Sequence, residues 1–313
     1  MPLIAIGDEL LEQVAEASFN ASEQTRIHIE GEIAGLIPEL METLSPEGPY
    51  AYTILPEVRP DGSVRLPVLT TREQIRDAYQ MIRGMSELLS VSALTEVRGE
   101  WYTFQDSISR TRLRHNGRYG ASQTLALFPT GQDSGITGEL VWARKPREML
   151  GARDGVLPPP VDADPLRALV SGPPGTAERE QVFQLHVRYV EALCGNDAEA
   201  IAETLNPGVA SAVRDYVNPT GTLAMLEGIE AHRAYYRAFF ETFEVLSVQP
   251  LDRIAEDWYV FAEMRVTARW RVGADVGRVC TFNTAEFHVP ANDGRFIARI
   301  GHGTDPCTGP GTA

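Results

Sequence analysis

Hydrophobic and polar positions divide the chain into two halves that repeat the same order of elements. Each half begins with a region of helical periodicity, over residues 7–44 and 177–216. In the second region the apolar side chains that recur at helical spacing are Val182, Leu185, Tyr189, Val190 and Leu193. A shorter helix is predicted to start near Thr71 in the first half and near Gly228 in the second.

Strand-like alternation follows these helices, from about Leu89 and from about Leu246 to the end of each half. Between the halves lies a proline-rich segment. Because proline fixes φ and lacks an amide donor, that segment cannot continue a helix or a central strand. We therefore predict a first module over residues 1–145, a linker over 146–176 and a second module over 177–313.

The two modules also align as an internal repeat. A shift of 157 positions places Trp101-Tyr102 on Trp258-Tyr259 without a gap. Upstream, a shift of about 161 places Glu42-Thr43-Leu44 on Glu203-Thr204-Leu205, so the first half has about four more residues in the intervening loop. The repeat predicts two pockets, or one pocket and one scaffold.

Composition narrows the range of partners. The chain has 313 residues, a formal net charge of -15 and a pI of about 4.9. Such an acidic surface repels phosphate backbones, so we expect neither a nucleic-acid partner nor an anionic membrane partner. The three cysteines, Cys194, Cys280 and Cys307, lack the short spacings of zinc or redox motifs. With no signal peptide and no membrane-spanning apolar run, we expect a cytoplasmic protein.

The second half resembles the NTF2-like superfamily, which includes ketosteroid isomerases, SnoaL-type polyketide cyclases, small dehydratases and epoxide hydrolases. The resemblance begins with Arg188-Tyr189-Val190-Glu191-Ala192-Leu193, the end of a long first helix. A tight turn follows, and in it Asp197 is positioned to cap a second helix. Asn218-Pro219-Thr220-Gly221 and a third helix from Gly228 come next, and Glu256-Asp257-Trp258-Tyr259 opens a long strand.

The resemblance implies an α+β fold of two NTF2-like cone modules, each a bent antiparallel sheet wrapped around a long helix. Such a cone is lined by apolar and aromatic side chains with few polar groups, as is usual for a small-molecule pocket. Modules of this superfamily often pair through the outer faces of their sheets. We therefore expect the two modules to pair within one chain, with a homodimer left open.

Tyrosines on the first and third helices are the first candidates for chemistry. By resemblance, Tyr189 matches a tyrosine that donates a hydrogen bond to a substrate oxyanion, and Tyr236 matches one that supports it. The repeat places His28 opposite Tyr189 and Tyr79 opposite Tyr236. The alternative for Tyr189 is a tyrosine packed for its area with its hydroxyl satisfied, and the alternative for His28 is a half-exposed helix histidine.

Carboxylates on the strands after the two Trp-Tyr pairs are the second candidates. If Tyr259 and Phe261 line the cone, alternation places Glu263 and Arg265 on the same face. The same reasoning places Asp106 inside the first cone. A desolvated carboxylate is a usable general base, so Glu263 is the predicted proton-transfer residue, with Arg265 orienting a carbonyl or anion. The alternative is that the register is one residue off and these charges face water, or that Glu263 and Arg265 form a pair at the rim.

Departures from the isomerase pattern limit the functional prediction. Asn218 stands where the isomerase has its catalytic base, and an amide cannot take a proton. No two histidines are spaced i, i+4, and phosphate-binding loops are absent, so no metal and no cofactor are predicted.

We predict a cofactor-independent lyase, isomerase or cyclase acting on a hydrophobic small molecule with a carbonyl or phenol. The alternative is a non-catalytic module that binds a small molecule or a protein. In a third arrangement, one half is catalytic and the other is a scaffold.

Overall fold

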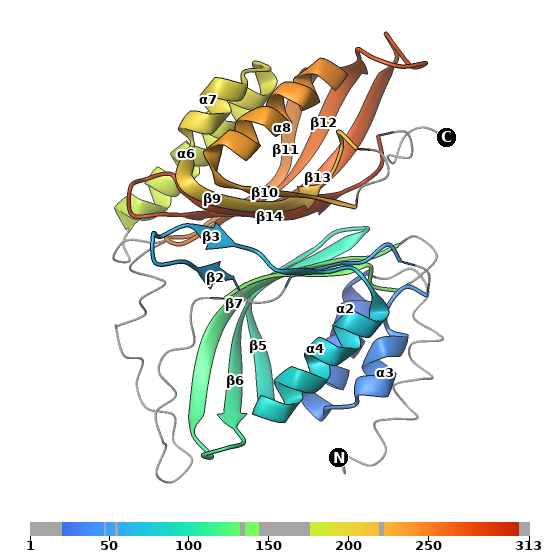
Figure 1. Cartoon of the computed structure of the whole chain (residues 1–313), viewed down its shortest axis with the longest axis vertical. Helices are drawn as coiled ribbons and strands as arrows, with labels where there is room; N and C mark the ends of the chain where they lie inside the picture. Colours follow the sequence, from blue (N-terminus) through green and yellow to red (C-terminus); the bar gives the residue numbers. More distant parts are fainter. Residues whose placement is uncertain are drawn as a thin grey trace. The chain divides into compact units, whose positions relative to one another are not determined.

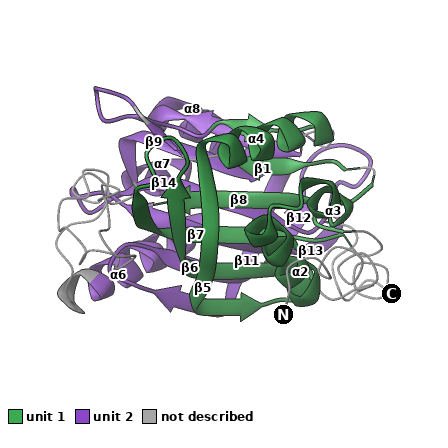
Figure 2. Ribbon diagram, turned by 90° about the horizontal axis from the view of Figure 1, so that it is seen from below, with its two compact units in different colours: residues 1–55, 67–164 green, residues 56–66, 165–313 purple. Residues whose placement is uncertain are grey.

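The computed structural model describes residues 21–46, 48–53, 56–131, 135–143, 176–218 and 222–306. The chain divides into two units, the first formed by residues 1–55 and 67–164 and the second by 56–66 and 165–313 (Figure 2). Almost all of the predicted linker lies outside the described residues, so it stays a prediction. No helix in the described part of the chain is both long enough and apolar enough to span a membrane.

Unit 1 packs three described helices against one face of a six-stranded sheet (Figure 1). The helices are α2 (Ala21–Ala34), α3 (Ile37–Glu42) and α4 (Arg72–Met85). In spatial order the strands are β4 (Val68–Leu69), β1 (Ala51–Thr53), β8 (Gly138–Ala143), β7 (Tyr119–Pro129), β6 (Tyr102–Leu113) and β5 (Ser86–Arg98). The shorter helix predicted to start near Thr71 is confirmed as α4, because Thr71 forms a reciprocal capping box with Gln74.

Unit 2 has the same arrangement (Figure 1). Its helices are α6 (Thr176–Cys194), α7 (Ala198–Glu203) and α8 (Gly228–Thr242). Its strands, in spatial order, are β10 (Leu223–Glu227), β9 (Leu205–Arg214), β14 (Phe296–Gly303), β13 (Val279–Pro290), β12 (Val260–Trp270) and β11 (Phe243–Ala255). A small hairpin of β2 (Glu57–Val58) and β3 (Val64–Arg65) also belongs to this unit, where Arg59 donates to Glu227 at 2.8 Å.

The caps of unit 2 agree with the sequence, but one element differs. Asp197 caps α7 by accepting from the amides of Glu199 and Ala200, as predicted. The helical region expected up to residue 216 ends at Cys194 and Glu203, and residues 205–214 form strand β9 instead. This strand pairs on both sides, with β10 and β14, and so satisfies its backbone groups through the sheet.

The internal repeat is confirmed by the irregularities of the two sheets. Bulges interrupt β5 between Leu88 and Ser90 and between Ala93 and Thr95. Bulges interrupt β11 between Val245 and Ser247 and between Pro250 and Asp252, each 157 positions later. Bulges bend a strand, so the same two bends shape both sheets. Each sheet is antiparallel except for one parallel pair, β1 with β8 and β9 with β14.

Burial identifies the helix-facing side of each sheet. In β12 the residues that pack into the core with α6 and α8 are the even-numbered ones: Val260, Ala262, Met264, Val266 and Ala268. In unit 1 the helix-facing residues of β7 are Ala126 and Phe128, which pair with Gln105 and Thr103 of β6. The inward positions are therefore odd-numbered in β6 and even-numbered in β12.

The predicted strand register is wrong by one residue in both units. Glu263 and Arg265 lie on the sheet face opposite the helices of unit 2, and Asp106 lies on the corresponding face of unit 1. The aromatic residues used to choose the face, Tyr102 and Phe261, are themselves fully buried on that opposite face. Alternation shows that two faces differ, but it cannot say which one meets the helices when both carry buried aromatic side chains.

Candidate functional site

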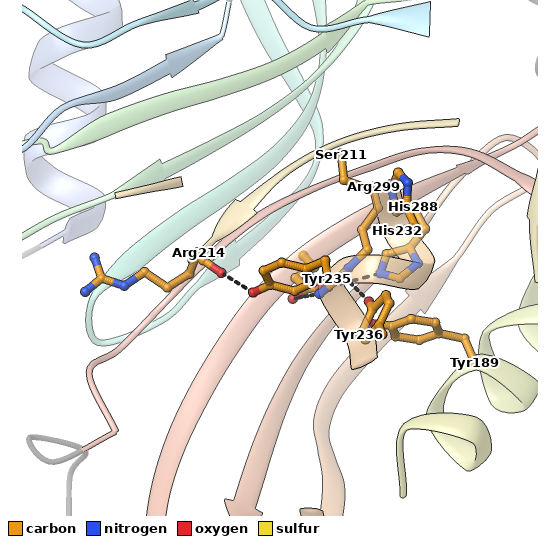
Figure 3. A network of polar contacts seen from close by, with 9 residues as sticks. Tyr189, Ser211, Arg214, His232, Tyr235, Tyr236, His288 and Arg299 are labelled. Atoms are coloured by element: carbon orange, nitrogen blue, oxygen red, sulfur yellow. Dashed lines mark hydrogen bonds and ion pairs between the residues drawn. The ribbon is translucent and has the colours of Figure 1, made fainter. Parts of the chain in front are cut away.

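A cluster of charged and phenolic side chains lies inside unit 2, between its helices and its sheet (Figure 3). Tyr189 comes from α6 and Tyr236 from α8, while Glu286, His288 and Arg299 come from the adjacent strands β13 and β14. Each of the five is at most 7 % exposed. The cluster is therefore a desolvated polar site within an apolar core.

Arg299 and Glu286 form a bidentate ion pair at the base of this cluster. Arg299 Nε donates to Glu286 Oε2 at 2.7 Å and Nη2 donates to Oε1 at 2.8 Å. Burial disfavours the charged carboxylate, but the Arg299 guanidinium outweighs it and holds the pKa of Glu286 well below its usual range. Glu286 is therefore a fixed anion that is already paired, and it is not a general base.

Gly301 makes room for this ion pair. It lies opposite Glu286 in the register of β13 and β14. A Cβ at position 301 would stand 2.4 Å from Glu286 Cγ and 2.6 Å from the carbonyl oxygen of Ala285. The absence of a side chain therefore lets the Glu286 carboxylate reach Arg299.

The two tyrosines extend the ion pair toward α6. Arg299 Nη1 donates to the Tyr236 hydroxyl, and the hydroxyls of Tyr236 and Tyr189 lie 2.9 Å apart. These two contacts use one guanidinium N–H and one phenol O–H. Because two phenols carry two protons, one O–H remains without an acceptor among the described residues. Burial raises the pKa of both phenols, which keeps them protonated at neutral pH.

Two histidines stand beside this donor. The His288 ring lies 4.9 Å from the Tyr189 ring, and the His186 ring lies 5.2 Å from that of His288. His288 Nε2 is 3.3 Å from Glu286, whereas both ring nitrogens of His186 lack a hydrogen-bond partner in the described structure. Burial lowers the pKa of His186 well below its ordinary value, so its imidazole is neutral at neutral pH.

Unit 1 brings together the two residues that the repeat predicted there. His28 Nε2 lies 2.9 Å from the Tyr79 hydroxyl, and that hydroxyl donates to Glu139 at 2.5 Å. Asp106 does not join them. It lies on the other face of the sheet, where the side chain of Gln123 donates to both its oxygens at 2.9 and 3.0 Å.

Unit 2 brings Tyr189 and Tyr236 together, but not Glu263 and Arg265. Arg265 Nε lies 3.4 Å from Asn283 on the opposite face. Arg299, His186 and Glu286 were not predicted from the sequence. Glu286 is placed at an inward position only by the register of β13, in which it pairs with the core residue Ala262. The roles assigned to all these residues stay predictions.

Candidate metal ligands were sought over the whole described part of the chain. No group of three or more histidine, cysteine, aspartate or glutamate side chains there is arranged to hold a metal ion.

Comparisons with known proteins find a domain match in the second unit. Residues 186–299 match the SnoaL-like domain, and no curated protein matches the chain. Similar solved structures include a candidate isomerase from Bacillus subtilis, with 16 % identity over 41 % of this chain and 88 % of that one, and a TM-score of 0.35. A candidate SnoaL-like polyketide cyclase from Jannaschia sp. CCS1 has 19 % identity over 42 % and 91 %, and a TM-score of 0.35.

An epoxide hydrolase from M. tuberculosis, described as LEH-like, is also similar. It has 13 % identity over 40 % of this chain and 84 % of that one, and a TM-score of 0.31. The match of residues 186–299 covers the first helix of unit 2 from His186 and ends at Arg299, so it spans the whole buried cluster. The likeness of this chain to the SnoaL-like domain therefore rests on its second unit.

Proposed function

We propose that this protein is a proton-transfer enzyme of the isomerase or cyclase type, which acts on a hydrophobic small molecule that carries a carbonyl or phenol. The observation that supports the proposal is the unused phenol proton of the Tyr189–Tyr236 pair, buried beside the neutral imidazole of His186. A donor and an acceptor side by side in apolar surroundings are what enolisation of a carbonyl compound requires.

In this proposal Tyr189 stabilises the developing oxyanion. Arg299 donates to Tyr236, Tyr236 donates to Tyr189, and the Tyr189 O–H is left for the substrate oxygen. The guanidinium polarises both phenols, because each hydrogen bond in a chain strengthens the next. Glu286 neutralises and orients Arg299, which makes it a positioning residue.

His186 replaces Glu263 as the proposed base. Its ring is 5.9 Å from that of Tyr189, and it is fully buried on the same helix. A neutral imidazole takes a proton from carbon and returns it to another atom of the same molecule, so the reaction needs no net acid or base from solvent. Tyr189 is also fully buried, so a substrate reaches its hydroxyl only after side chains of the cone move.

Hydrogen exchange into simple ketones tests the proposal. Cyclohexanone and its 2-methyl derivative would be incubated in D₂O with the full chain, and loss of the α-proton signals would be followed by NMR. Tyr189→Phe is expected to lower the exchange rate by about 10²-fold or more, because one oxyanion donor is removed. His186→Gln is expected to abolish exchange above the background rate.

Tyr235→Phe is the matched control. Tyr235 also lies on α8 and is largely buried, but its hydroxyl donates to the Arg214 carbonyl and accepts from the Tyr216 amide, both at 3.3 Å. It has no proton to spare, so its loss is expected to leave the exchange rate within about threefold, against the far larger effect of an oxyanion donor. Equal rates for wild type and Tyr189→Phe, at equal thermal stability, would refute the oxyanion role.

A binding module is the second candidate function. It is favoured by the complete burial of the cluster and by the Arg299–Glu286 pair, in which both charges are already neutralised. Titration with 2-naphthol, followed by its fluorescence, separates the two. Binding that weakens in Tyr189→Phe, together with no ketone exchange by wild type, would support ligand binding without turnover.

A further inference from the structure

A chain of four short polar contacts crosses the core of unit 1. Thr43 Oγ1 lies 2.6 Å from the Leu40 carbonyl oxygen and 2.6 Å from His28 Nδ1. His28 Nε2 lies 2.9 Å from the Tyr79 hydroxyl, which lies 2.5 Å from Glu139 Oε2. His28, Thr43 and Tyr79 are all at most 6 % exposed, so the chain is shielded from solvent up to Glu139, whose side chain is 16 % exposed.

The corresponding site of unit 2 has a different charge. Tyr79 corresponds to Tyr236 by the shift of 157 positions. Glu139 is paired with Tyr52 across β8 and β1, in the same way that Arg299 is paired with Ser211 across β14 and β9. A guanidinium that only donates is therefore replaced in unit 1 by a carboxylate that, when ionised, only accepts.

Counting protons shows what this replacement does. Each of the four contacts needs one hydrogen between its two heavy atoms. Thr43 supplies one proton, a neutral His28 supplies one and Tyr79 supplies one, whereas an ionised Glu139 supplies none. The Leu40 carbonyl can only accept, so Thr43 must donate to it and His28 Nδ1–H must donate to Thr43. One contact, at Tyr79, is then left without a proton.

All four contacts can be hydrogen bonds only if the network holds a fourth proton. That proton lies either on His28 Nε2, which makes the ring an imidazolium, or on Glu139, which makes it a carboxylic acid. In both cases the three residues share a proton that can leave along the chain toward Glu139, the most exposed member. The Tyr189–Tyr236 pair of unit 2 has one O–H without an acceptor in the described part of the chain, whereas the network of unit 1 has one contact without a proton.

Two further groups face this network. The Tyr52 hydroxyl, on a residue 3 % exposed, has no hydrogen-bond partner within the described structure, and Tyr52 is the register neighbour of Glu139. Glu32 comes from α2. Its partial burial and the nearby Glu139 raise its pKa to about 8, while Arg83 from α4 opposes this. An unsatisfied buried phenol beside a carboxylate needs a ligand or a bound molecule to meet its hydrogen-bonding capacity.

We propose that unit 1 is a second acid–base site, in which His28, Tyr79 and Glu139 hold one shared proton and deliver it to a small molecule whose hydroxyl or carbonyl oxygen lies beside Tyr52. Delivery moves the proton from Glu139 to the ligand oxygen and leaves His28 neutral and Glu139 ionised. The four contacts cannot then all persist, so the network opens until a proton returns from solvent. This proposal does not depend on the site proposed in unit 2.

Protonation of the full chain can be read directly by NMR. We would record ¹⁵N shifts of the histidine rings and ¹³C shifts of the glutamate carboxyls at pH 7, with signals assigned from His28→Gln and Glu139→Gln. A protonated His28 Nε2 or a protonated Glu139 supports the proposal. A neutral His28 ring together with an ionised Glu139 overturns it.

His232 provides an internal control in the same spectra. It is also fully buried, but its Nδ1 donates to the Gly228 carbonyl at 2.7 Å and its Nε2 accepts from Ser211 at 2.7 Å. Two contacts have two protons, so this ring is expected to be neutral. Its signals show how a buried neutral histidine appears in this protein.

Glu139→Gln tests the proton count. An amide N–H at position 139 donates to Tyr79, Tyr79 then donates to His28 Nε2, and all four contacts are satisfied with a neutral ring. We therefore expect the variant to show His28 as the neutral Nδ1–H tautomer and to keep its fold, whereas loss of the tautomer or of the native spectrum argues against the network.

A ligand titration tests the other half of the proposal. With 2-cyclohexenone as the probe, the His28 and Glu139 signals are expected to shift in wild type and not in Tyr52→Phe. No shift in wild type up to the solubility of the probe, or equal shifts in Tyr52→Phe, would overturn the ligand site. Because these signals belong to unit 1, Tyr189→Phe is expected to leave them unchanged, which separates this proposal from the function proposed for unit 2.

Discussion

Loss of the Glu286 carboxylate should strongly destabilise unit 2. In Glu286→Gln, the two charge-assisted hydrogen bonds of 2.7 and 2.8 Å are replaced by at most one bond to a neutral amide oxygen, while Arg299 remains only 7 % exposed. Hydrogen bonds to charged groups contribute about 1.5–3 kcal/mol each, which gives roughly 3–6 kcal/mol for the two. Removing one partner of a buried pair costs about 3–5 kcal/mol, because the other charge stays buried. We expect a loss in this range.

Urea denaturation of the full chain, followed by tryptophan fluorescence, measures this loss. Trp258 and Trp270 report on unit 2, and Trp101 and Trp142 report on unit 1. The midpoint for unit 2 should fall in Glu286→Gln, whereas the midpoint for unit 1 should not. Since the pKa of Glu286 lies well below the usual range, its contribution is present above the usual carboxyl pKa and is lost only as the pH falls through the lowered value.

Glu244→Gln is the matched control for this measurement. Glu244 accepts from Arg269 at 2.8 Å in the same unit, but the two side chains are 35 % and 44 % exposed. Exposed pairs contribute about 0–1 kcal/mol, so this variant should unfold almost as wild type does. Equal losses for Glu244→Gln and Glu286→Gln would refute the reasoning, because they would show that burial does not set the strength of the pair.

Three more changes have defined outcomes. Glu32→Gln should raise the free energy of unfolding relative to wild type by on the order of 2 kcal/mol at pH 9 and by much less at pH 5. The reason is that the folded-state pKa of Glu32 is raised to about 8, so the stability of the wild type falls as the pH rises. Denaturation at both pH values checks this. Gly301→Ala should lower the free energy of unfolding by about 1–3 kcal/mol, because the added Cβ would clash with Glu286. Gly84→Ala should not destabilise the protein, because a Cβ added there has no other atom within 4 Å. The melting temperatures of both variants test this difference. Glu263→Gln should leave ketone exchange at the wild-type rate, since this side chain is on the face away from Tyr189; a loss as large as that of Tyr189→Phe would restore it as the base.

Local signals in the sequence predicted the elements of this fold well. The caps at Thr71 and Asp197 mark helix starts, since a side-chain oxygen that accepts from the first free amides acts within a few residues. The repeat was also visible in the sequence, because two copies of one fold keep the same aromatic and bulge positions. The Tyr189–Tyr236 contact followed from helix positions and a family resemblance together.

The site itself depended on which face of each sheet meets the helices. Glu263 and Glu286 both alternate with apolar neighbours, and nothing within either strand tells an inward position from an outward one. The register of β12 against β13, and of β13 against β14, decides this, because a shift of one residue exchanges the two faces of the strand that shifts.

The sequence by itself therefore determined two α+β modules, their caps and their repeat, which arise from interactions between residues close along the chain. Only the tertiary structure decided the chemistry. Arg299 meets Tyr236 and Glu286, and Glu139 meets Tyr79, across strands and helices that are far apart in sequence. Whether a buried phenol faces a guanidinium or a carboxylate sets its proton balance, and that pairing exists only after the sheet has closed over the helices.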